Sequence, residues 1–144
     1  MRISLGSDHR GYKVKEYLKN VLKDLEIEYS DEGAFNEESC DYPDFAEKAV
    51  KKVIKKNSDF AILICGSGLG MSIAANRFKG IRAALCLTVE MAQMAREHNN
   101  ANVLVLSANF IELKEASSIL NTWLSSNFEG GRHERRIRKI DEFK

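Results

Sequence analysis

Short apolar runs alternate along this chain with segments of helical periodicity, and this alternation constrains the fold more than any other feature. The runs typical of strands lie at residues 2–6, 27–30, 60–65, 82–87 and 102–107. Between them, apolar residues such as Val14, Leu18 and Val21 recur at the spacing of a helix with one buried face. A regular succession of strands and helices predicts a five-stranded parallel sheet with helices on both sides.

The composition narrows the class of protein. A chain of 144 residues with 44% apolar residues is typical of one globular domain, which we expect to cover residues 1–144. Its net charge of +1 argues against a nucleic-acid partner. No apolar run approaches the ~20 residues of a membrane span, and the first residues turn polar too early for a secretion signal. Cys40, Cys65 and Cys86 lack the paired spacing of a zinc site. We therefore expect reduced thiols, a cytoplasmic location and no membrane partner.

In a parallel α/β sheet, ligands bind beyond the carboxyl ends of the strands. Asp8 and His9 follow the first predicted strand, and residues 65–70 follow the third. The loop after the fifth strand begins near Ser107. We expect the functional site where these three loops meet.

The loop "CGSGLGMS" after the third predicted strand combines glycines with a thiol. It lacks the Gly-Lys-Ser/Thr of a nucleotide-binding loop, and Met71 stands where the third glycine of the dinucleotide fingerprint would fall. Successive N–H groups at the start of a helix can nevertheless hold an anion, and the same field would stabilise a Cys65 thiolate. The alternative interpretation is a cysteine that merely packs at the end of a buried strand.

Other polar residues also allow two interpretations. Asp8 can cap the following helix, although this would not explain His9. His98 and Asn99 close a predicted helix, where a histidine is favourable against the helix dipole. Tyr42, in "CDYPDF", could simply cover the start of its helix.

The carboxyl-terminal segment "GGRHERRIRKI" predicts a basic helix over about residues 132–141. Arg132 and Arg136 are four residues apart, so they share one face and could hold a phosphate. The alternative is a solvated basic tail. Gly130 and Gly131 suggest a bend that redirects this helix, and a partner subunit is one place for it to pack.

Five stretches together resemble one family: "GSDHRGYKVK", "DYPDFA", "CGSGLGMSIAANRFKGIRAAL", "REHNNANVL" and "FEGGRHERRIRKI". Through them the chain resembles type B ribose-5-phosphate isomerases and the related allose- and galactose-6-phosphate isomerases. The resemblance implies a Rossmann-like α/β/α sandwich of three layers, forming homodimers or homotetramers whose active sites are shared between subunits. It implies that neither a metal nor a nucleotide cofactor is needed.

The resemblance also implies roles for individual residues in aldose–ketose isomerisation of ribose 5-phosphate, a reaction of the pentose phosphate pathway. Cys65 would move a proton between the first two sugar carbons through an enediolate, and Ser67 would relay a proton between the two oxygens. Asp8 and His98 would help to open the sugar ring. The implied substrate-binding residues are His9, Tyr42, Gly66, Gly68, Gly70, Asn99, Arg132 and Arg136.

One departure from the family pattern bears on the substrate. Many relatives have an arginine in the loop after the fifth strand, where this chain reads "LSANF", so Asn109 cannot supply that charge. The proton-transfer motifs do not distinguish ribose 5-phosphate from six-carbon sugar phosphates. A non-catalytic sugar-phosphate sensor is a further alternative, but it would have little use for Cys65, Asp8 and His98 together. A nucleotide-dependent oxidoreductase is disfavoured by Met71.

Overall fold

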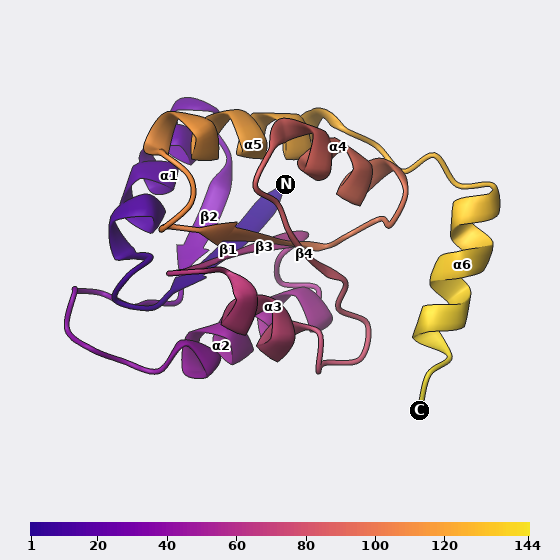
Figure 1. Ribbon diagram of the computed structural model, residues 1–144, viewed down its shortest axis with the longest axis horizontal. Coiled ribbons are helices and arrows are strands. Elements are labelled where there is room, and N and C mark those ends of the chain that lie inside the picture. Colours follow the sequence, from indigo (N-terminus) through magenta and orange to yellow (C-terminus); the bar gives the residue numbers. More distant parts are fainter.

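A computed structural model describes all residues 1–144 as a twisted sheet covered by helices (Figure 1). The strands are β1 (Arg2–Ser7), β2 (Glu28–Asp31), β3 (Phe60–Cys65), β4 (Ala83–Leu85) and β5 (Val103–Ser107). The helices are α1 (Tyr12–Asp24), α2 (Tyr42–Ile54), α3 (Leu69–Ala75), α4 (Val89–Glu97), α5 (Leu113–Ser125) and α6 (Arg132–Asp141). All neighbouring strands pair in parallel, which confirms the predicted five-stranded parallel sheet of an α/β fold.

The sheet separates two hydrophobic cores. Helices α1, α4 and α5 cover one face, whereas α2 and α3 cover the other (Figure 1). Successive side chains of β3 alternate between the cores: Ile62 and Ile64 face the first, and Leu63 and Cys65 face the second. Burial on both faces explains why this strand is apolar at every position.

The strand order, β2-β1-β3-β5-β4, determines where a ligand can bind. The chain winds outward from β1 to β2, then returns to place β3 on the other side of β1. Loops at the carboxyl ends of β1 and β3 therefore diverge and leave a crevice between them. Asp8 follows β1 and Cys65 ends β3, so both lie at this switch point.

One predicted strand is shorter than the sequence pattern indicates. The strand expected over residues 82–87 is limited to Ala83–Leu85, and the preceding helix α3 ends at Ala75. Asn76 joins the end of this helix to the start of the strand. Its side chain accepts a hydrogen bond from the Ala83 N–H at 2.8 Å and donates one to the Ala83 carbonyl at 3.0 Å. The chain is thus held in a turn between the helix and the strand.

None of the helices has the length and apolar character to cross a membrane. The last helix, α6, stands to one side of the sheet and its two covering layers (Figure 1). Its inner face carries His133 and Ile137, which are buried, whereas Arg132 and Arg136 are exposed.

A buried ion pair anchors α1 to the end of the edge strand β2. The Lys15 side chain is fully buried, and its Nζ donates to both carboxylate oxygens of Asp31 at 2.7 Å. Asp31 also accepts from Lys19 Nζ at 2.8 Å and from the Gly33 N–H at 2.9 Å. Burial alone would raise the pKa of Asp31, but these hydrogen bonds outweigh it and lower the pKa below its usual value.

We predict that Asp31→Asn lowers the free energy of unfolding at pH 7 by about 3 kcal/mol, because Lys15 then keeps a buried charge without its main partner. Folding lowers the pKa of Asp31, so its stabilising contribution is present above the unfolded pKa near ~4 and is lost as the pH falls through the folded value. Urea denaturation of both proteins at pH 7 and at acid pH should show the difference shrinking.

The matched control is Asp24→Asn, at the exposed end of α1, where the carboxylate forms no ion pair. It should change stability by less than about 0.5 kcal/mol. Equal effects of the two substitutions would contradict the role given to Asp31.

Candidate active site

A cavity of about 280 Å³ opens at the switch point between β1 and β3. The sequence-predicted residues that line it are Asp8, Tyr42, Cys65, Gly66, Ser67 and Gly70, and two further residues, Arg10 and Asn109, complete its wall. Residues from three separate loops and from the start of α2 are thus brought together.

The glycine loop between β3 and α3 is held from behind by the end of β5. The Gly66 carbonyl accepts from the Ser107 hydroxyl at 2.7 Å and from the Asn109 N–H at 2.9 Å, and the Cys65 carbonyl accepts from the Ala108 N–H at 2.9 Å. The N–H groups of Gly66, Ser67, Gly68 and Gly70 donate to no acceptor within the chain. A run of such donors can bind an anionic oxygen.

Glycine is required in this loop for two different reasons. Gly68 begins α3 with φ of +80°, a left-handed conformation in which a Cβ would also overlap Leu85. Gly70 has an ordinary helical backbone, but a Cβ there would lie 2.5 Å from the Tyr42 ring. The Tyr42 ring therefore rests directly on the helix that follows the glycine loop.

Cys65 is both a core residue and a lining residue of the cavity. It is 4% exposed and packs in the core beneath the sheet, yet it also lines the cavity. The other two thiols lie elsewhere. Burial raises the pKa of Cys86 to about 12, so this thiol stays protonated. Burial also raises the pKa of Cys40, against the effect of its contact with His9.

Asp8 and His9 are both oriented by backbone groups. Asp8 Oδ1 accepts from the N–H groups of Arg10 and Gly11, each at 3.0 Å, so it closes the turn before α1, whereas no side chain caps the helix itself. No protein group donates to Asp8 Oδ2. His9 Nδ1 accepts from the Cys40 N–H at 3.3 Å, which leaves Nε2–H as the donor of the neutral ring.

His98 and Asn99 lie where the strands of the sheet begin, which we call the amino edge. Cys65 lies where the strands end, which we call the carboxyl edge. His98 and Asn99 end α4 shortly before Asn102, whose carbonyl accepts from Ala61 at the start of β3. Cys65 instead pairs with Ser107 at the far end of β5, which has 5 residues. At ~3.3 Å per residue, the strand separates the two edges by roughly 15 Å. One chain therefore does not bring His98 and Cys65 together.

Arg82 ties the His98 segment to α6. Its guanidinium donates to the carbonyls of Asn99 and Asn100 at 3.0–3.2 Å and forms an ion pair with Asp141 at 3.3 Å. The residues predicted for the site thus form two groups. One group lies at the amino edge and on α6 and consists of His98, Asn99, Arg132 and Arg136. The other predicted site residues lie at the carboxyl edge.

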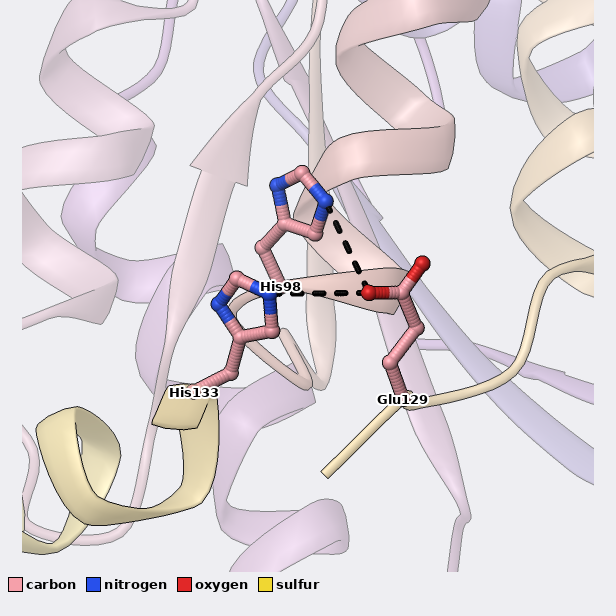
Figure 2. A group of neighbouring side chains, drawn as sticks. All are labelled: His98, Glu129 and His133. Carbon is pink, nitrogen blue, oxygen red and sulfur yellow. Dashed lines mark ion pairs between the residues drawn. The ribbon is translucent and has the colours of Figure 1, made fainter. Parts of the chain in front are cut away.

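His98, Glu129 and His133 form the only group of three potential metal ligands in the chain (Figure 2). The two imidazole rings are stacked, with centroids 4.4 Å apart and planes inclined by 11°. A metal lies in the plane of each imidazole that binds it, about 2.0–2.1 Å from the nitrogen. Planes this close to parallel do not meet at such a distance, so this arrangement does not fit metal coordination.

Several residues at these two edges were not predicted from the sequence. Arg10 lies within the quoted stretch "GSDHRGYKVK", and its place directly after His9 is a signal that could have revealed it. His133 follows Arg132 in the glycine-led helix, but its position facing His98 depends on the fold. Glu129 and Arg82 also lie within quoted stretches, but their local pattern does not mark them as site residues.

The parallel sheet with a thiol, a carboxylate and unpaired N–H groups at its switch point defines an α/β protein built to hold a small polar ligand there. The family model described as Ribose/Galactose Isomerase matches residues 3–140. The chain belongs to this family and is a sugar-phosphate isomerase.

Individual relatives cover nearly the whole chain. The chain is 45% identical to a putative sugar phosphate isomerase of Rickettsia bellii over 139 residues, 96% of each protein. It is 40% identical to ribose-5-phosphate isomerase B of Escherichia coli over 139 residues, 96% of this chain and 93% of that protein.

Solved structures of related proteins show the same fold. A ribose 5-phosphate isomerase from Thermotoga maritima is 56% identical with a TM-score of 0.97, covering 99% of this chain and 98% of that one. The enzyme from Mycoplasma genitalium, solved with bound ribulose-5-phosphate, is 44% identical with a TM-score of 0.93, covering 97% and 93%.

Proposed function

We propose that this protein interconverts D-ribose 5-phosphate and D-ribulose 5-phosphate. The observation that carries the proposal is the placement of the Cys65 thiol in the same cavity as Asp8 and the loop of unpaired N–H groups. The similarity to the Mycoplasma genitalium enzyme, whose structure holds ribulose-5-phosphate, supports this choice of sugar.

Proton transfer between the first two sugar carbons is the central step. In the open-chain aldose, the Cys65 thiolate removes the proton from the second carbon, and the electron pair moves to the carbonyl oxygen to give an enediolate. The unpaired N–H groups of Gly66, Ser67, Gly68 and Gly70 stabilise the negative oxygen as it forms. Ser67 passes a proton from one oxygen to the other, and Cys65 returns its proton to the first carbon to complete the ketose.

Ring opening precedes this step because the aldose is mainly a closed furanose. A proton leaves the anomeric hydroxyl and another reaches the ring oxygen, and we assign these transfers to Asp8 and His98. Asp8 is buried at the cavity wall, with Oδ1 held by two backbone N–H groups. Tyr42 covers one side of the cavity, and Asn99 is assigned to a sugar hydroxyl.

The phosphate is assigned to His9, Arg132 and Arg136. Arg132 and Arg136 lie one turn apart on α6, and both are exposed, so they can direct two guanidinium groups at one phosphate. They lie with the His98 group, away from the Cys65 cavity of their own chain.

The separation of the two groups supports a shared site in a two-fold dimer, alone or within a tetramer. In such a dimer, the amino edge and α6 of one subunit meet the carboxyl edge of its partner. Exposed apolar side chains beside the cavity, Leu69, Ile73 and Phe110, support burial of this region in an assembly.

The proposed function is tested with Cys65→Ala in an assay of ribulose 5-phosphate formation. Loss of a general base should lower turnover by at least about 10²-fold, while binding of the sugar phosphate, measured by calorimetry, stays nearly unchanged. Cys86→Ala, which removes a buried thiol outside the cavity, is the control and should retain turnover. Allose 6-phosphate and galactose 6-phosphate assayed in parallel will show whether six-carbon sugars are preferred. Retention of turnover by Cys65→Ala would exclude this residue as the base.

The phosphate assignment makes a separate prediction. Arg136→Ala should raise KM for ribose 5-phosphate by about tenfold or more, the loss expected for one charge-assisted contact to phosphate. Its neighbour Arg135 is equally exposed but faces another side of α6, so Arg135→Ala should leave KM nearly unchanged. Steady-state kinetics of the two variants compare them directly. An unchanged KM for Arg136→Ala would remove this residue from the site.

Complementation tests the shared site. Cys65→Ala and His98→Asn proteins are mixed under conditions that exchange subunits, which leaves one intact site in each hybrid dimer. Random exchange makes half of all dimers hybrids, and each hybrid has one intact site of its two. The mixture should therefore regain about a quarter of the wild-type activity.

The control for this experiment is a mixture of Cys65→Ala with Ser67→Ala. Both lesions lie in the same glycine loop, so every site of a hybrid dimer carries one of them and activity should stay absent. If exchange is demonstrated by mass spectrometry and the first mixture also remains inactive, His98 and Cys65 serve the same sugar from one chain.

A further inference from the structure

The geometry points to Glu129 and His133 as positioning residues that hold the His98 ring for sugar-ring opening. This inference rests on the proposed function, in which His98 takes part in that step. It concerns two side chains that the proposed mechanism does not use and that lie against His98 in Figure 2.

The same carboxylate oxygen of Glu129 lies near both imidazole rings. Glu129 Oε2 lies 3.5 Å from His133 Nε2 and 4.0 Å from His98 Nε2. The rings stack on each other with centroids 4.4 Å apart. The His133 side chain is only 11% exposed, compared with 38% for His98. The buried His133 ring therefore packs against one face of the more accessible His98 ring.

The backbone places Glu129 beside His98. The Glu129 N–H donates to the carbonyl of Glu97 at 3.0 Å, and Glu97 is the residue before His98. Gly130 and Gly131 then have φ of +70° and +58°, a conformation that other residues rarely adopt. The turn they form lets His133, four residues after Glu129, face the same histidine.

This arrangement favours one nitrogen of His98 as the free one. The negative Glu129 oxygen favours a proton on Nε2 of the ring that it faces. The neutral His98 ring then has its lone pair on Nδ1, which points away from Glu129 in Figure 2. Nδ1 is therefore the atom through which His98 exchanges a proton with the furanose, and stacking on His133 restrains rotation of the ring.

The experiment separates ring opening from proton transfer at carbon. Conversion of ribose 5-phosphate requires both steps, whereas ribulose 5-phosphate is open-chain and can exchange the hydrogen of its first carbon with solvent through the enediolate alone. Conversion is measured by steady-state kinetics, and exchange is measured by NMR with ribulose 5-phosphate deuterated at that carbon.

For Glu129→Gln, which keeps the backbone hydrogen bond and the size of the side chain, we expect kcat for ribose 5-phosphate to fall about tenfold or more, with KM unchanged. The exchange rate should stay within about twofold of wild type, because His98 is not needed for proton transfer at carbon. His133→Ala should behave in the same way, and His133→Phe should lose less, because a flat ring still supports His98.

The matched control is Glu134→Gln in α6, directly after His133, where the carboxylate is exposed and pairs with Arg138 at 2.8 Å. It should leave both rates unchanged. If Glu129→Gln leaves conversion unchanged or lowers both rates equally, the positioning role is wrong. If the wild-type protein does not convert ribose 5-phosphate at all, the proposed function fails, and this role fails with it.

Discussion

The carbonyl group of Gly66 is the point on which the candidate active site depends. It accepts hydrogen bonds from the Ser107 hydroxyl and the Asn109 N–H, so the end of β5 holds the glycine loop of β3 from behind. Because the carbonyl groups of this loop accept hydrogen bonds from the end of β5, the loop is held with the N–H groups of Gly66, Ser67 and Gly68 unpaired. Unpaired donors in a rigid backbone can stabilise a developing negative charge without reorganisation. The same hydrogen bonds fix the chain directly after Cys65.

The buried pairing of Lys15 with Asp31 supports the site from a greater distance. It anchors the end of β2, from which the chain continues through Gly33 towards Cys40 and its hydrogen bond to His9. A histidine on the surface is thus oriented through a loop whose anchor is an ion pair in the interior.

The division of the site residues between two edges of the sheet is the main consequence of the topology. A parallel sheet is rigid, and His98 cannot cross the length of β5 to reach Cys65. Helix α6 stands beside the body of the subunit with Arg132 and Arg136 exposed, and Arg82 links its end to the carbonyls of Asn99 and Asn100. The group that contains His98 is therefore a connected unit. Symmetric pairing of two chains is the simplest way for it to meet the group around Cys65, and this is the physical basis of the proposed shared site.

The sequence by itself determined the local elements and the residue types at the loops, because helical periodicity and continuous apolar runs report which faces are buried. It predicted a thiol, an aspartate and glycines at the carboxyl ends of β1 and β3, and the structure brings these together in one cavity. Only the tertiary structure decided the strand order and hence the switch point, because the sequence of a strand does not indicate which distant strand it pairs with. Likewise, Arg10, Glu129 and His133 take their places through contacts between segments far apart in the chain or on either side of a turn. A charged residue in a polar stretch has the same local pattern whether it faces solvent or a neighbouring histidine, and only packing distinguishes the two.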